Sequence, residues 1–173
     1  MKRVIVLIGG ALLLSTLAAE RTEAAMTKVE LQNAQGERVG TATLEAVPDG
    51  VKIVLQATKL PPGQHGWHIH AVGKCEPPDF TSAGNHFNPQ GKKHGRENPE
   101  GSHAGDLPDL VVGSDGAAQA EVLVTHVTLD PTGATSLLQG EGTALVIHAN
   151  PDDQKTDPAG NAGARIACGV IPK

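Results

Sequence analysis

The amino-acid sequence predicts an all-β fold, a sandwich or a barrel built from eight short strands. Short runs rich in Val, Ile, Leu and Thr recur along the chain, and turn signals separate them. No stretch shows a convincing helical period, so helix is expected to be scarce. A series of short strands with turns between them is typical of a sandwich or a barrel. With 173 residues, of which 39% are hydrophobic and 19% charged, the chain fits one globular domain.

The strands follow from local sequence patterns. The tripeptides PDG at 48–50 and SDG at 114–116 are hairpin signals between neighbouring runs. The core must be mostly aliphatic, because the aromatic residues are only Trp67, Phe80 and Phe87, with no tyrosine. In chain order, the expected strands cover residues 27–32, 38–47, 51–59, 66–72, 110–113, 117–124, 143–149 and 164–171.

Residues 1–24 have the pattern of a secretory signal peptide. Lys2 and Arg3 precede an apolar run, and small residues follow it up to Ala24. No later stretch approaches the roughly 20 apolar residues that a transmembrane helix needs. We therefore expect cleavage near Ala24, a single domain over residues 25–173, and export to a periplasm or an extracellular space. The net charge is −5, and the chain lacks the basic patch typical of a nucleic-acid-binding protein. Neither nucleic acid nor a membrane is therefore an expected partner.

Export decides how the two cysteines, Cys75 and Cys168, are interpreted. Outside the reducing cytosol a pair of cysteines in a small domain is usually a disulfide, with two buried free thiols as the alternative. A bridge over so long a loop removes about 4–5 kcal/mol of unfolded-state conformational entropy in the chain-entropy model.

Residues 73–109 are too rich in proline and glycine to form a strand. A structureless loop of this length is uncommon in a compact domain and is usually functional or held by something other than backbone pairing. The loop carries four residues of metal-ligand type that could close it around an ion: His86, His94, His103 and Asp106.

Three more histidines are expected to converge on one side of the sheet. Side chains two apart on a strand share a face, so His68 and His70 point together while their neighbours enter the core. His148 repeats this alternation at the end of the run at 143–149. Neutral imidazole suits copper and zinc, and three histidines with one carboxylate suit a closed tetrahedral zinc site. Two histidines spaced two apart on a strand are, by themselves, more often surface residues. The inference of a metal site therefore rests on the whole set of candidate ligands.

From about residue 27 to residue 171 the chain resembles the copper/zinc superoxide dismutases. The resemblance rests on five motifs, namely HGWHIH, TSAGNHFNP, KKHG with SHAGDLPDL, LVIHANPDD and GNAGARIACGV. It implies an eight-stranded Greek-key β-barrel with a long metal-binding loop. The electrostatic loop between His148 and Arg165 is shorter than in the eukaryotic enzymes, and the spacing of His70 and Cys75 is closer to that of exported bacterial ones.

The resemblance also implies a role for each site residue. The copper ligands would be His68, His70, His86 and His148, and the zinc ligands would be His86, His94, His103 and Asp106. His86 would bridge the two metals and take part in catalysis. Arg165 would guide the substrate, Asp152 would link a copper ligand to a zinc ligand, and Cys75 and Cys168 would form the family disulfide. Lys74 and Lys155 are candidate additional steering residues.

The implied activity is dismutation of superoxide to dioxygen and hydrogen peroxide, by alternate reduction and reoxidation of a histidine-bound copper beside a structural zinc. One alternative is an exported copper- and zinc-binding protein that buffers or delivers metal without turnover. Another is a cupin, because HGWHIH followed by Glu76 loosely echoes the motif of that barrel, although a cupin leaves the loop histidines unexplained. The oligomeric state is expected to be a monomer or a homodimer.

Overall fold

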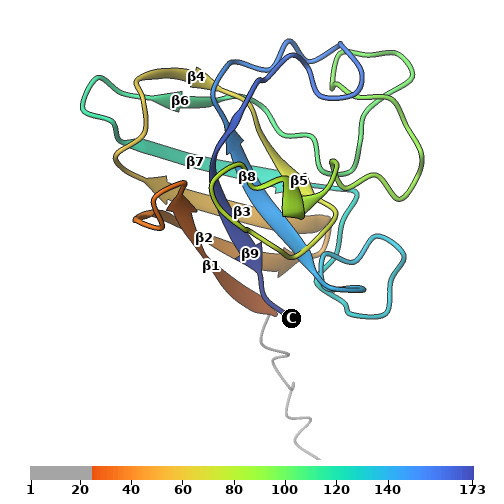
Figure 1. The fold of residues 1–173 in the computed structure, drawn as a ribbon. Helices are drawn as coiled ribbons and strands as arrows, with labels where there is room; N and C mark the ends of the chain where they lie inside the picture. The colour runs from red at the N-terminus through yellow and green to blue at the C-terminus, as the bar shows by residue number, and fades with distance from the viewer. Residues whose placement is uncertain (1–24) are drawn as a thin grey trace, which may run out of the picture.

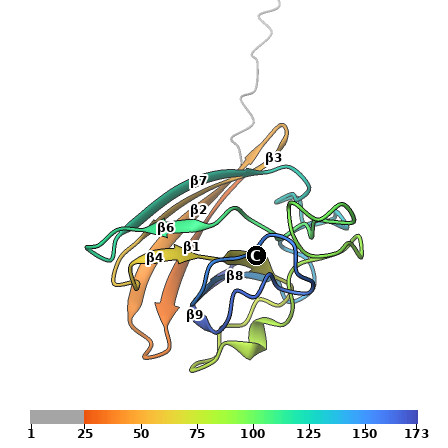
Figure 2. The same cartoon turned by 90° about the horizontal axis from the view of Figure 1, so that it is seen from above.

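The computed structural model describes residues 25–173, so the predicted signal peptide at 1–24 lies outside the described residues. A curled antiparallel sheet of seven strands has the order β5-β8-β9-β1-β2-β3-β7, and a two-stranded sheet, β4-β6, lies across its open side (Figures 1 and 2). The strands are β1 (Met26–Asn33), β2 (Arg38–Val47), β3 (Gly50–Ala57), β4 (Gly63–His65), β5 (Trp67–His70), β6 (Leu110–Val112), β7 (Ala118–Val124), β8 (Thr143–His148) and β9 (Arg165–Ile171).

All eight predicted runs form strands, and the eight-stranded Greek-key barrel is confirmed. The ninth element is β4, which lies just before the predicted run at 66–72 and was not predicted; Gly66 separates it from β5. A Cβ at Gly66 would lie 2.9 Å from the Ala162 Cβ and 3.1 Å from the Asp152 Cβ, so only glycine fits this close approach. β4 pairs with β6, whereas β5 pairs with β8. The break therefore passes one strand from one sheet to the other.

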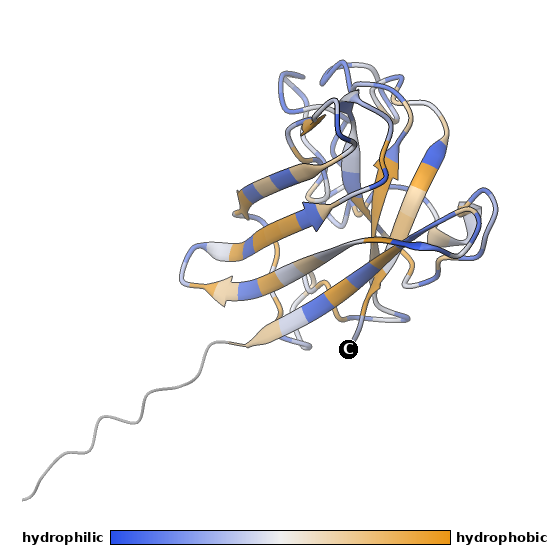
Figure 3. Ribbon diagram, turned by 90° about the vertical axis from the view of Figure 1, so that its left-hand side faces the viewer, coloured by the Kyte–Doolittle hydropathy of each residue, from blue (hydrophilic) through white to orange (hydrophobic). Residues whose placement is uncertain are grey.

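Alternation of buried and outward-facing side chains, clearest on β3, builds the interior of the barrel. On β3, Val51, Ile53 and Leu55 are fully buried, while Lys52 and Gln56 between and after them point outward. Figure 3 shows this as alternating hydrophobic and hydrophilic bands. The interior is largely aliphatic, as predicted, and a smaller cluster lies on the other face of β8 and β9. The smaller cluster contains Phe80, Ala83, Ala144, Val146 and Cys168, with Cys75 packed against it.

The connection from β5 to β6 is the long loop expected from its prolines and glycines. Within the described residues its only helical segment is the short 3-10 helix η1 (Thr81–Ala83). A disulfide joins Cys75 in this loop to Cys168 on β9. Backbone hydrogen bonds from Phe87 to Ile69 and from Ile69 to Gly105, 2.8 and 2.9 Å long, lay the loop along β5. No helix within residues 25–173 has the length and apolarity needed to cross a membrane.

Candidate metal centre

β5 and β8 bring three imidazoles to one face of the sheet. On β5, Trp67 and Ile69 enter the core, so His68 and His70 project from the opposite face. His148 ends β8 on that same face, and the Nε2 atoms of His70 and His148 lie 3.4 Å apart. All three histidines are buried beneath the long loop. The convergence predicted from strand parity is confirmed.

The long loop adds a fourth imidazole to this group. The backbone of His86 forms an isolated antiparallel β-bridge with His70 of β5. The ring of His86 stacks on the ring of His68, with 4.0 Å between the ring centroids. One nitrogen from each of the four histidines lies within 4.8 Å of the others. We call this group, formed by His68, His70, His86 and His148, the four-histidine group.

A second group shares His86 and surrounds a carboxylate. The Asp106 Oδ1 atom lies 3.0 Å from His86 Nδ1, 3.1 Å from His94 Nδ1 and 3.3 Å from His103 Nδ1. The other oxygen, Oδ2, accepts the backbone N–H groups of Gly95 and His103. Three imidazole nitrogens and one carboxylate oxygen thus face a common point. We call this group, formed by His86, His94, His103 and Asp106, the three-histidine–aspartate group.

His86 belongs to both groups through different nitrogens. Its Nδ1 atom faces Asp106, while its buried Nε2 atom has no hydrogen-bond partner among the described residues. The Nδ1 atom of His68 is also buried without a partner. A buried polar atom without a partner destabilises a fold by about 1–3 kcal/mol. A cation at the centre of the four-histidine group would satisfy both nitrogens, so these residues fit a metal ion.

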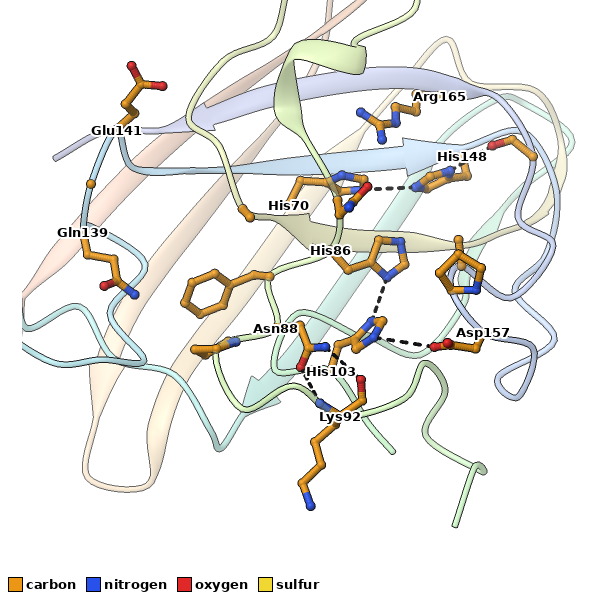
Figure 4. A pocket seen from close by; sticks show the side chains of 18 residues that line it. His70, His86, Asn88, Lys92, His103, Gln139, Glu141, His148, Asp157 and Arg165 are labelled. Carbon is orange, nitrogen blue, oxygen red and sulfur yellow. Dashed lines mark hydrogen bonds and ion pairs between the residues drawn. The ribbon is translucent and has the colours of Figure 1, made fainter. Parts of the chain in front are cut away.

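The outward-facing nitrogens fix the orientation of the rings. His70 Nδ1 donates to the Gly84 carbonyl at 2.9 Å, and His148 Nδ1 donates to the Gly163 carbonyl at 3.1 Å. Because a carbonyl oxygen can only accept, the proton sits on Nδ1 and the lone pair on Nε2 points inward. Such outer acceptors are characteristic of metal-ligating histidines. Figure 4 shows His70, His86 and His148 together at the inner end of a cavity.

Asp152 links the two groups through hydrogen bonds to one histidine of each. Its Oδ2 accepts from His68 Nε2 at 2.7 Å, and its Oδ1 accepts from His94 Nε2 at 3.0 Å. The carboxylate is fully buried, as are both imidazoles. One side chain therefore orients one histidine of each group, at the position the sequence suggested for it.

Burial keeps three members of the four-histidine group, His70, His86 and His148, neutral. Desolvation lowers the pKa of His148 to about 3, and it lowers the pKa of His86 to about 4 although Asp106 opposes the shift. Desolvation also holds the pKa of His70 well below its usual value. These imidazoles are therefore unprotonated at neutral pH, which is the state that binds a metal.

His94 behaves differently because two carboxylates face it. Burial disfavours its protonation, yet hydrogen bonds to Asp106 and Asp152 outweigh burial and raise the pKa of His94 to about 9. Burial alone would raise the pKa of Asp106, but its three histidine partners hold that pKa far below the usual value. In the absence of a cation, a proton on His94 balances the buried negative charge.

Arg165 begins β9 beside His148 and lines the same cavity, whose volume is about 820 Å³ (Figure 4). Its guanidinium donates to the carbonyls of Phe80 and Gly84, at 2.6 and 2.7 Å. The Gly84 carbonyl therefore serves both Arg165 and His70. Desolvation lowers the pKa of Arg165 from its usual value.

The structure places the candidate steering lysines away from the cavity. Lys74 pairs with Glu141, and Lys155 pairs with Glu97, each at 2.9 Å. Neither lysine lines the cavity, whereas Lys92 does. Lys92 is the first residue of the KKHG motif, two positions before His94, and this motif was the sequence signal that could have identified it.

Sequence reasoning also missed Asp157. Its Oδ1 accepts the backbone N–H of His94 at 2.7 Å and lies 3.9 Å from His103 Nε2. Asp157 comes from the loop between β8 and β9, and no local pattern marks it as a partner of the other loop. The ring nitrogens of His65 each lie 2.8 Å from a backbone carbonyl oxygen, one of Pro61 and one of His148, so His65 has a structural role.

The barrel and its two adjoining ligand groups define a candidate dinuclear metal-binding protein. The family model for copper/zinc superoxide dismutase matches residues 38–171. The chain belongs to the copper/zinc superoxide dismutase family.

Relatives in bacteria agree with this assignment. The chain is 52% identical to superoxide dismutase [Cu-Zn] 1 of Aquifex aeolicus over 84% of this chain and 86% of that protein. It is 49% identical to superoxide dismutase [Cu-Zn] 2 of the same organism over 99% of both chains. Among solved structures, a double mutant of a SOD-like protein from Bacillus subtilis superposes with a TM-score of 0.82 at 43% identity, covering 84% of this chain and 97% of that chain. That protein is described as SOD-like, so the residues of the site must carry the functional argument for this chain.

Proposed function

We propose that this protein catalyses the dismutation of superoxide, in which two superoxide anions and two protons give one dioxygen and one hydrogen peroxide. The observation that carries the proposal is His86, whose two ring nitrogens belong to two different ligand groups. A cation held only by the three-histidine–aspartate group would leave His86 Nε2 buried without a partner. Copper and zinc are the cofactors of the family to which the chain belongs.

We assign copper to the four-histidine group and zinc to the three-histidine–aspartate group. An all-imidazole set suits copper, and three imidazoles with a carboxylate suit tetrahedral zinc. Asp152 orients His68 in the first set and His94 in the second. When bound, copper supplies a one-electron redox couple and zinc supplies a fixed positive charge.

The chain's own residues provide a proton-relay atom and an anion site. His86 Nε2 is buried beside the rings of His70 and His148. As in the mechanism of the family, this nitrogen takes up a proton and hands it on during turnover. Arg165 attracts superoxide into the cavity, against the net charge of −5 of the chain.

We further propose that the protein is exported, to a periplasm or an extracellular space, after removal of residues 1–24. The disulfide between Cys75 and Cys168 supports an oxidising compartment. The bacterial relatives in the family are compatible with either location. Mass spectrometry of protein recovered after export locates the cleavage site, and sedimentation of the same sample distinguishes a monomer from a homodimer.

The deciding experiment measures superoxide removal, copper content and zinc content on one preparation of exported protein. Activity should track copper and collapse in His148→Ala, which removes one imidazole of the four-histidine group. His126→Ala serves as a matched control, because His126 is an exposed histidine that belongs to neither group and does not line the cavity. Fully metallated protein that removes superoxide no faster than buffer would overturn the proposal and leave metal buffering or delivery as the function.

A further inference from the structure

We propose that Phe80 is a positioning residue for Arg165: its buried ring holds the carbonyl oxygen that orients the guanidinium, and thereby sets the anion affinity of the cavity. The inference deepens the proposed function, because it concerns the group that receives the anionic substrate. It extends to a side chain that belongs to neither ligand group.

Two carbonyls hold the guanidinium of Arg165. The Nη1 atom donates to the Phe80 oxygen at 2.6 Å, and the Nη2 atom donates to the Gly84 oxygen at 2.7 Å. These two residues flank η1, so the two acceptors sit at either end of one helical turn. Hydrogen bonds from a charged donor are stronger than neutral ones and are sensitive to geometry. The direction of the guanidinium therefore depends on where the backbone at Phe80 lies.

The backbone of Phe80 adopts an unusual conformation. Its φ of 55° and ψ of 24° lie in the left-handed region, which residues other than glycine rarely adopt. Such a conformation persists only when surrounding contacts over-determine it. The carbonyl of Phe80 also accepts a hydrogen bond from the N–H of Ala83 at 3.1 Å. The backbone N–H of Phe80 donates to the carbonyl of Glu76 at 3.1 Å. These backbone contacts are made within the loop itself and do not tie it to the barrel.

The ring of Phe80 makes that attachment. It is fully buried in the small cluster, with Ala144 and Val146 of β8 and Cys168 of β9. Those strands also carry His148 and Arg165. The ring thus fixes η1 to the two strands whose residues face the substrate. The disulfide joins Cys168 of β9 to Cys75, which lies five residues before Phe80. The disulfide therefore does not fix the Phe80 carbonyl directly.

The expected effect is partial, since Gly84 still holds Arg165 when the Phe80 carbonyl moves. Phe80→Ala should weaken anion binding by about threefold to tenfold, which is less than complete loss of a charge-assisted hydrogen bond would cause. Arg165→Gln should weaken it further. Phe80→Leu refills much of the ring's volume, so it should restore most of the affinity.

The test measures the dissociation constant of azide, a small monovalent anion, by visible absorption of copper- and zinc-loaded protein. Phe80→Ala and Phe80→Leu are made in the wild-type chain and in an Arg165→Gln background. Leu44→Ala is the control, because Leu44 is fully buried in the main core and does not line the cavity. Urea unfolding of each variant separates loss of stability from loss of anion affinity.

Weaker azide binding in Phe80→Ala, recovery in Phe80→Leu, no further effect in the Arg165→Gln background and none in Leu44→Ala would support the proposal. Unchanged affinity in folded Phe80→Ala, or the same loss in the Arg165→Gln background, would overturn it. If Phe80→Ala does not fold, Phe80→Leu and Phe80→Val give the same comparison in both backgrounds. Because azide binding is not turnover, wild-type protein that binds azide without removing superoxide would count against the proposed function alone.

Discussion

Asp152 offers the sharpest test of the coupling between the two ligand groups. Its two oxygens accept hydrogen bonds from His68 Nε2 and His94 Nε2, at 2.7 and 3.0 Å, and all three side chains are fully buried. Asp152→Ala removes both acceptors at once. Asp152→Asn keeps one acceptor oxygen and replaces the other with an amide donor, so only one histidine retains a partner. A graded response is therefore expected from the two substitutions.

The magnitude follows from the two bonds. Each charge-assisted hydrogen bond contributes about 1.5–3 kcal/mol, and loss of such an outer partner typically weakens metal binding by about 10–100-fold. Asp152→Ala should therefore lower the affinity for copper and the affinity for zinc by about that factor each. For at least one metal, the affinity of Asp152→Asn should lie between that of Asp152→Ala and that of the wild type.

Competition with chelators of known affinity measures both constants on the same protein. Asp153→Asn is the matched control, because the neighbouring carboxylate bonds only to residues of its own loop, Lys155, Thr156 and Asn161. The control should keep wild-type affinity for both metals. Wild-type copper and zinc affinities in Asp152→Ala would refute the view that one carboxylate orients a histidine of each group.

Three further outcomes follow from the same geometry. Arg165→Gln should lower kcat/KM by about tenfold or more and flatten its dependence on ionic strength in stopped-flow assays; an unchanged salt dependence would contradict a guiding role. Replacing Cys75 and Cys168 by alanine should reduce the free energy of unfolding in urea by about 4–5 kcal/mol, and a loss below about 1 kcal/mol would show that the cross-link matters little. Because the pKa of His94 is raised to about 9, zinc must displace a proton from its Nδ1 at neutral pH. Zinc affinity should rise by up to about tenfold per pH unit from pH 7 toward pH 9, with proton release visible by calorimetry in two buffers; a flat pH profile would contradict the protonated state of His94.

Much of the barrel could be predicted from the chain because strand formation is local. Alternation on β3 marks which side chains enter the core, and the turn residues mark where strands end. The break at Gly66 was not predictable, since it reflects contact with Asp152 and Ala162, which lie 86 and 96 positions later in the chain. Likewise, the Phe80 carbonyl became a partner of Arg165 only through packing between the long loop and β9.

By itself, the sequence determined the all-β class, the parity that sets His68 and His70 on one face, and the set of candidate ligands. These depend on the two-residue period of a strand and on side-chain chemistry, both of which are local. Only the tertiary structure decided that His86 faces both groups with different nitrogens, that Asp152 serves one histidine of each, and that Lys74 and Lys155 are held by other carboxylates. Those relations join residues tens of positions apart, and their geometry exists only once the loops pack onto the barrel.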